Sequence, residues 1–71
     1  MNIMINGEER NVAELMTVEQ LIKSLGLDGR KVAIERNLEI IPKSQYNDIV
    51  LTEGDKLEIV HFIGGGAQSQ S

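Results

Sequence analysis

The 71-residue chain contains no cysteine and no tryptophan, and only one histidine, one proline, one tyrosine and one phenylalanine. Without cysteine, disulfide bonds, cysteine-ligated zinc or iron–sulfur clusters and thiol catalysis are all excluded. The single histidine, His61, has no second type of metal ligand clustered near it in the sequence. We therefore predict that His61 is a partly exposed strand residue that contacts a partner, and that it binds no metal.

Long apolar runs and an excess of positive charge are also missing. No apolar segment approaches the roughly 20 residues that cross a bilayer, and residues 1–7 lack a cationic leader, so we expect a soluble, cytoplasmic protein. Seven basic against eleven acidic residues give a net charge of −4, which disfavours nucleic acid and acidic membranes and favours a partner with a basic surface. A chain of this length forms one domain and is too short to enclose a substrate, so an enzyme acting alone is not expected.

The first half of the chain predicts a hairpin followed by a helix. Residues 2–5 are prone to form a strand, Asn6-Gly7 favours a type I′ turn, and residues 8–12 form the return strand. Thr17 and Gln20 form a capping box, and Gly26 suits the position that ends a helix. One apolar stripe on this helix is expected to face the core. Its members are Val18, Leu21, Ile22 and Leu25.

The second half predicts three more extended segments. Residues 32–34 and 38–41 form short strands, Pro42 ends the second, a single helical turn occupies residues 44–48, and the last strand covers residues 56–63. A hairpin, a crossover helix and further strands imply a mixed sheet in which the last strand lies beside the first. The predicted fold is α+β, a ubiquitin-like β-grasp with four to five strands packed on one main helix over residues 1–63.

The last predicted strand runs directly into Gly64-Gly65-Gly66, and the five residues Ala67–Ser71 follow. Because glycine has no Cβ, this segment is a flexible stalk narrow enough to enter a partner's active site, where it offers a carboxylate. We expect the chain to be mobile from Gly64 onward, since nothing there buries enough apolar area to offset the entropy of ordering.

Several segments taken together resemble the sulfur carrier proteins of thiamine biosynthesis, the ThiS family. They are VAIERN at residues 32–37, EIIPKSQY at 39–46, Gly54-Asp55, and EIVHFIGGG at 58–66. The resemblance covers nearly all of residues 1–66. A diglycine alone is a weak signal, but these segments in this order are highly specific.

The resemblance implies that the chain is a protein substrate, not an enzyme. By itself it is expected to be a monomer with no bound cofactor and no catalytic residue. A ubiquitin-activating-like adenylyltransferase, using ATP and magnesium, converts the carboxylate of Gly66 to an adenylate. A cysteine-derived sulfur donor then gives a thiocarboxylate, which supplies sulfur to thiazole synthase. Gly65 is the slender neighbour that this chemistry requires, and Gly64 is less strict.

The five residues after Gly66 depart from the family pattern. In the sequence as given, the carbonyl of Gly66 belongs to an internal amide, which cannot be adenylylated as a carboxylate. Our hypothesis is that a protease first removes residues 67–71; the alternative is that they are an added remnant or an inert frayed end.

Alternation along the last strand suggests a docking surface. Leu57, Ile59 and His61 share one face, and Val60 and Phe62 share the other with Glu58. If the first set faces the core, Val60 and Phe62 are exposed apolar groups beside a reactive tail, which is typical of a partner-binding surface. Alternatively, Phe62 covers an edge of the core.

The charged residues nearby receive simpler interpretations. Glu53, Asp55 and Glu58 either steer docking to a basic enzyme surface or form an ordinary solvated acidic surface. Arg36 and Asn37 are expected to shape a loop and are assigned no chemistry.

Three other functions stay open at this point: a sulfur carrier of another pathway, such as the small subunit of molybdopterin synthase; a ubiquitin-like modifier of lysines; and a non-covalent β-grasp adaptor. The middle segments favour the thiamine pathway.

Overall fold

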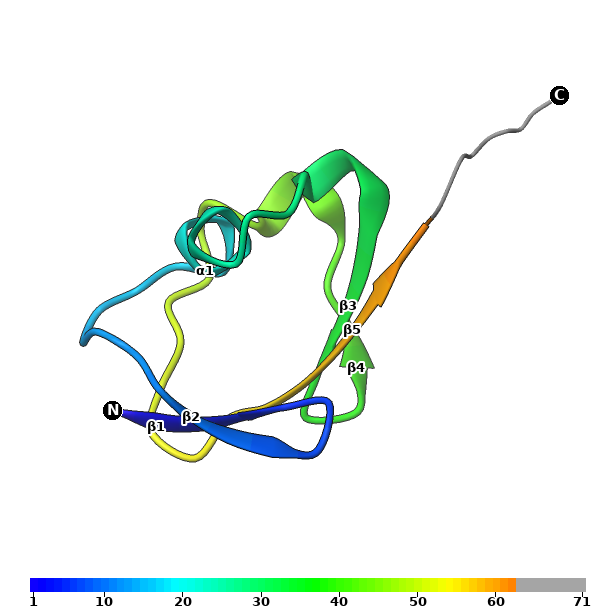
Figure 1. The fold of residues 1–71 in the computed structure, drawn as a ribbon. Helices are drawn as coiled ribbons and strands as arrows, with labels where there is room; N and C mark the ends of the chain where they lie inside the picture. The colour runs from blue at the N-terminus through cyan, green and yellow to red at the C-terminus, as the bar shows by residue number, and fades with distance from the viewer. Residues whose placement is uncertain (63–71) are drawn as a thin grey trace, which may run out of the picture.

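The computed structural model describes residues 1–62 and contains one mixed sheet with one α-helix packed on it (Figure 1). The sheet order is β2-β1-β5-β3-β4. The elements are β1 (Asn2–Ile5), β2 (Glu8–Asn11), α1 (Val18–Ser24), β3 (Val32–Arg36), β4 (Glu39–Ile40) and β5 (Lys56–His61), with 3₁₀ turns η1 (Gly29–Lys31) and η2 (Lys43–Gln45). This is the predicted β-grasp fold. The predictions for residues 63–71, including the flexible tail at 64–66, lie outside the described residues.

The last strand, β5, occupies the centre of the sheet. It pairs in parallel with β1 at Met4↔Lys56 and Ile5↔Leu57, and antiparallel with β3 over the register that ends at Val32↔His61. The prediction that the last strand lies beside the first is therefore confirmed. Because both neighbours hydrogen-bond to β5, the strand that leads to the C-terminal segment is held on two sides.

The N-terminal hairpin forms as predicted and also supports β5. Asn6 and Gly7 have φ values of 50° and 82°, as a type I′ turn requires. The Asn6 side chain accepts a hydrogen bond from the Ile59 backbone N–H at 2.7 Å and donates one to the Ile59 carbonyl at 3.2 Å. Asn6 thus continues the β1–β5 pairing beyond the end of β1.

The helix begins at the predicted capping box. The Gln20 backbone N–H donates to Thr17 Oγ1 at 3.1 Å, and the Thr17 N–H donates to Gln20 Oε1 at 2.9 Å. Gly26 follows the helix with φ 76°. Three members of the predicted stripe are fully buried and Leu25 is partly buried, so the stripe faces the core. The buried apolar residues are Ile3, Ile5, Val18, Leu21, Ile22, Val32, Ile34, Ile41, Tyr46, Leu51 and Leu57.

The β3–β4 connection differs from the prediction. β3 continues to Arg36, and β4 is shorter than predicted because Asn37 and Leu38 form a tight turn with φ values of 52° and 73°. Leu38, which was predicted to begin a strand, is instead 91% exposed. Leucine rarely adopts a positive φ, so nothing in the sequence predicted a turn at Leu38. Asn37 was the only residue of the pair whose type favours such a turn.

Asp55 is buried, which contradicts its interpretation as part of a solvated acidic surface. It is 4% exposed, whereas Glu53 and Glu58 are exposed. Its carboxylate accepts hydrogen bonds from Arg36 Nε at 2.9 Å, Asn37 Nδ2 at 3.1 Å, and the backbone N–H and hydroxyl of Thr52 at 2.9 and 3.1 Å. The reason is long-range: the β3–β5 register brings Arg36 and Asn37 over the turn that precedes β5, where they shape the loop as predicted.

The buried carboxylate predicts a pH-dependent stability. Burial acts to raise the pKa of Asp55, but the hydrogen bonds from Thr52, Asn37 and Arg36 outweigh it and hold the pKa below 3.8. A depressed folded-state pKa stabilises the fold above the unfolded value, and this stability is lost as pH falls below about 4. We expect Asp55→Asn to lower the free energy of unfolding by about 2 kcal/mol at pH 7.

Urea denaturation at about pH 7 and about pH 2.5 measures this effect. The difference between wild type and Asp55→Asn should shrink at the lower pH. Glu58 is an exposed carboxylate on β5, so Glu58→Gln is the control and should change stability by less than about 0.5 kcal/mol. A pH-independent difference for Asp55→Asn would contradict the role assigned to its charge.

Candidate functional site

The candidate site is the C-terminal end of β5, from which the glycine segment follows in the sequence. The β3–β5 pairing extends one residue past β5, because the Phe62 backbone N–H donates to the Lys31 carbonyl at 2.7 Å. Phe62 is also the last described residue. The backbone is therefore held in the sheet up to Phe62, four residues before Gly66. Four residues of fully extended chain span at most about 14 Å.

The predicted docking residues are exposed at this end of the strand. Val60 and Phe62 are 57% and 47% exposed, while Leu57 on the opposite face is buried. His61 is exposed, as predicted, and it lines a groove of about 290 Å³ together with Arg10 and apolar side chains of β5 and the segment after α1. Phe62 does not belong to the buried core cluster, which argues against its interpretation as a cover for the core edge.

A second apolar surface lies beside Val60 on the face of the sheet away from α1. The sheet register places Ala33 opposite Val60, and Ile40 of β4 is 67% exposed. These three residues, which we call the outer-face patch, line a hollow of about 70 Å³ with Glu35 and Glu58. Sequence reasoning found Val60 alone, because Ala33 and Ile40 join it only through strand register. The result is a small apolar surface bordered by carboxylates.

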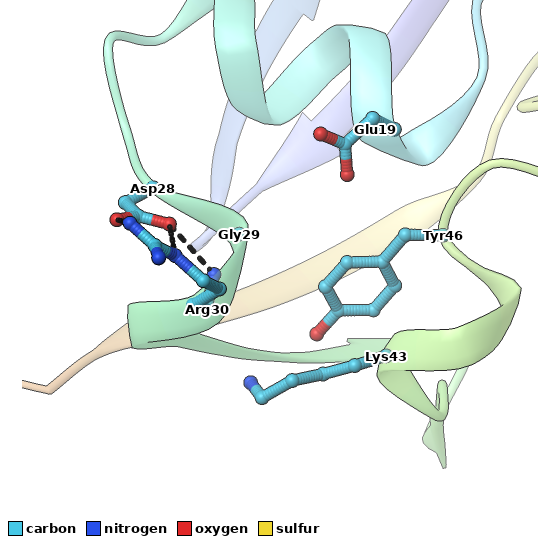
Figure 2. A pocket seen from close by; sticks show the side chains of 6 residues that line it. All are labelled: Glu19, Asp28, Gly29, Arg30, Lys43 and Tyr46. Carbon is cyan, nitrogen blue, oxygen red and sulfur yellow. Dashed lines mark hydrogen bonds and ion pairs between the residues drawn. The ribbon is translucent and has the colours of Figure 1, made fainter.

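Figure 2 shows a cleft on the helix side of the C-terminal end of β5. The cleft has a volume of about 280 Å³ and is lined by Glu19, Asp28, Gly29, Arg30, Lys43 and Tyr46. Asp28 caps η1 by accepting the Arg30 backbone N–H at 2.9 Å, and its other oxygen pairs with the Arg30 guanidinium at 2.9 Å. Hydrogen bonds from the Arg30 side chain lower the pKa of Asp28 to about 2.

The remaining polar groups of the cleft also have internal partners. The Tyr46 hydroxyl donates to the Val32 carbonyl at 3.3 Å, and burial raises the pKa of this phenol. Glu19 pairs with Lys23 at 3.7 Å one turn along the helix. The Tyr46 hydrogen bond ties the end of η2 to β3, the other pairs lie within η1 and α1, and nothing in the cleft identifies an acid–base pair for catalysis.

Within residues 1–62, no group of three or more histidine, cysteine, aspartate or glutamate side chains is placed to hold a metal ion. The one α-helix described there is too short to cross a membrane.

Comparisons with known proteins agree on one family. The model of the ThiS family matches residues 3–66. The chain is 46% identical over 65 residues to the sulfur carrier protein ThiS of Bacillus subtilis, which covers 90% of this chain and 98% of that protein. It is 63% identical over 67 residues to a thiazole synthase of Paramagnetospirillum magneticum, covering 94% of this chain.

The chain spans only about a fifth of the length of that thiazole synthase, 21%. Among solved structures, the thiamine biosynthesis protein (ThiS) of Geobacter metallireducens matches with a TM-score of 0.79 at 30% identity, covering 93% of this chain and 100% of that one. The matches thus cover the described fold and, in the family comparison, extend to the third glycine.

Proposed function

Because the chain belongs to the ThiS family, we propose that it is the sulfur carrier of thiamine biosynthesis and carries sulfur on the carboxylate of Gly66. The observation that supports this most is the family match over residues 3–66, which ends at the glycine that the chemistry needs. The geometry agrees, since β5 is the central strand of the sheet. Its first residues pair with both β1 and β3, and its last residues are held on the β3 side up to Phe62.

In this proposal the chain is a protein co-substrate of two enzymes. A resting carboxylate is a poor electrophile, so an adenylyltransferase must first join it to AMP, with ATP and magnesium bound by that enzyme. A sulfur nucleophile derived from cysteine then attacks the carbonyl carbon, AMP leaves, and a thiocarboxylate of Gly66 results. Gly64 and Gly65 make this end of the chain narrow enough to enter each enzyme, because neither residue carries a Cβ.

Thiazole synthase is the proposed acceptor of the sulfur. Support comes from the Paramagnetospirillum magneticum protein of that name, in which a segment 63% identical to this chain makes up about a fifth of the length, 21%. A carrier segment inside a protein named thiazole synthase favours a direct contact between carrier and synthase.

Val60, His61 and Phe62 are the residues that we propose contact these enzymes. They are the last three residues that the structure describes, all of them exposed, and Val60 belongs to the outer-face patch. The carboxylates of Glu35 and Glu58 border that patch, and Glu39 is exposed in the edge strand β4. Such a surface fits an apolar area bordered by basic side chains on the partner, and the opposite charges accelerate association.

A reconstitution with purified components tests the proposal. A chain ending at Gly66 is incubated with the adenylyltransferase, ATP, magnesium and the sulfur donor, and intact-mass spectrometry follows the product. We expect replacement of one oxygen by sulfur and transfer of that sulfur to the thiazole by thiazole synthase. If the loaded chain supported molybdopterin formation as the small subunit of molybdopterin synthase, and not thiazole formation, it would belong to another pathway. Lysine-linked products would indicate a modifier.

The variant Gly66→Ala separates all tail chemistry from a non-covalent adaptor. An adaptor does not use the terminal residue, so its function would survive the change. We expect sulfur loading to fall at least about tenfold, because the added methyl group enters a path shaped for glycine.

A further inference from the structure

Lys43 contacts both the start of β3 and the residue that follows β5. The docking surface described above assigns no role to this lysine. Its ammonium group donates a hydrogen bond to the Val32 carbonyl. It also lies 5.6 Å from the centroid of the Phe62 ring and 5.8 Å from that of Tyr46. One cation therefore contacts two aromatic rings and a strand carbonyl at the point where the described chain ends.

The hydrogen bond to Val32 replaces a missing strand. On the β4 side of β3, the Ile34 carbonyl accepts the Ile41 N–H at 2.9 Å. The Val32 carbonyl, two residues earlier, faces the same edge, because alternate residues of an antiparallel strand bond to the same neighbour. In a continued β4 the backbone N–H of Lys43 would reach this carbonyl, but the chain turns into η2 at Lys43. The Lys43 side chain and the Tyr46 hydroxyl supply the donors instead, which anchors η2 to β3.

The anchored ammonium then acts on Phe62. A cation over an aromatic face is attracted by the ring quadrupole, and this geometry lies within the range where the attraction is significant. The Phe62 backbone is already held by the Lys31 carbonyl at 2.7 Å. Lys43 therefore holds the side chain of the same residue whose backbone makes the last described bond of the sheet.

We propose that Lys43 is a positioning residue that fixes Phe62 in place and so sets where the glycine segment begins its path into the adenylyltransferase. The inference rests on the proposed function. With Phe62 held, its ring keeps one position before the tail enters the enzyme. Without the cation, the Phe62 side chain must be ordered in the complex, and this entropy cost falls on the chemical step and not on docking.

The test compares Lys43→Met, which keeps the alkyl stem and removes the charge, with Lys43→Arg, which keeps the cation and its donors. For Lys43→Met we expect kcat of adenylylation to fall about tenfold with KM within about twofold. Lys43→Arg should restore most of kcat. Lys23→Met, a lysine with a 74% exposed side chain on α1, is the matched control and should leave both constants unchanged.

Hydrogen exchange at the Phe62 amide provides a readout that does not depend on the enzyme. Its exchange rate should rise in Lys43→Met and return toward wild type in Lys43→Arg, while the Ile34 amide in the sheet centre stays unchanged. A purely structural role would instead raise exchange throughout β3 and β5. A wild-type exchange pattern in Lys43→Met would overturn the inference.

A double-mutant cycle tests whether Lys43 acts through Phe62. In a Phe62→Leu background, the change Lys43→Met should have no further effect on kcat, because the ring that the cation holds is gone. A full effect in both backgrounds would overturn the inference and indicate direct contact between Lys43 and the enzyme. If the unmodified chain ending at Gly66 is not adenylylated at all, the proposed function fails, whereas an active chain with an unchanged Lys43→Met variant refutes only the positioning role.

Discussion

A chain that ends at Gly66 is expected to be adenylylated, whereas the 71-residue chain is expected to be inert until residues 67–71 are removed. The reaction needs a carboxylate oxygen to attack the α-phosphorus of ATP. In the longer chain, the Gly66 carbonyl is bonded to the nitrogen of Ala67, and an amide offers no such oxygen. We expect a difference of at least about a hundredfold in the rate of pyrophosphate release.

Two controls make this comparison specific. A chain ending at Ala67 carries a free carboxylate one residue too late, and it should react poorly because the terminal methyl group and the added length misplace the reacting oxygen. Addition of host extract to the 71-residue chain should restore activity if a host protease removes the extension. Equal rates for the chains ending at Gly66 and Ser71 would overturn both the processing hypothesis and the assignment of Gly66.

Val60→Asp is expected to weaken the productive encounter with the adenylyltransferase about thirtyfold in kcat/KM, mainly through KM. Val60 is 57% exposed in the outer-face patch, and a buried apolar contact of this kind contributes roughly 2 kcal/mol to an interface. The aspartate also adds a negative charge beside Glu58. Basic side chains on the partner would compensate part of this charge, but they would not replace the lost apolar contact.

Val50→Asp is the matched control for this change. Val50 is also an exposed valine, at 43%, but it lies in the isolated bridge to Thr17 at the start of α1 and outside the patch. Steady-state kinetics should show a wild-type KM for Val50→Asp. If both variants lose the same activity, the effect comes from surface charge or stability and the patch is not the docking surface. The KM effect of Val60→Asp contrasts with the kcat effect expected for Lys43→Met.

The parts of the fold that sequence reasoning predicted depend on local signals. The Asn6-Gly7 turn and the Thr17–Gln20 capping box each lie within four residues, and both formed as predicted. The order of strands and helix followed from these local signals together with the handedness and pairing rules of small sheets. The resemblance to the ThiS family, carried by segments in both halves of the chain, was confirmed by the family match over residues 3–66.

The parts that sequence reasoning missed depend on register between distant residues. Asp55 looked like an exposed turn residue because its partners Arg36 and Asn37 lie 19 and 18 positions earlier. Ile40 joins Val60 in one patch only after β4 pairs with β3. Lys43 was assigned no role from the sequence, and its contact with Phe62 depends on the turn into η2 after β4 ends at Ile40. None of these contacts has a sequence period that local patterning detects.

Intact-mass spectrometry of the chain isolated from its native host during thiamine starvation tests the central claim most directly. We expect a species that ends at Gly66 and in which one oxygen of the terminal carboxylate is replaced by sulfur. That single result would support both the assigned terminus and sulfur carriage. A full-length, unmodified chain as the sole species under starvation would contradict the claim that Gly66 carries the sulfur.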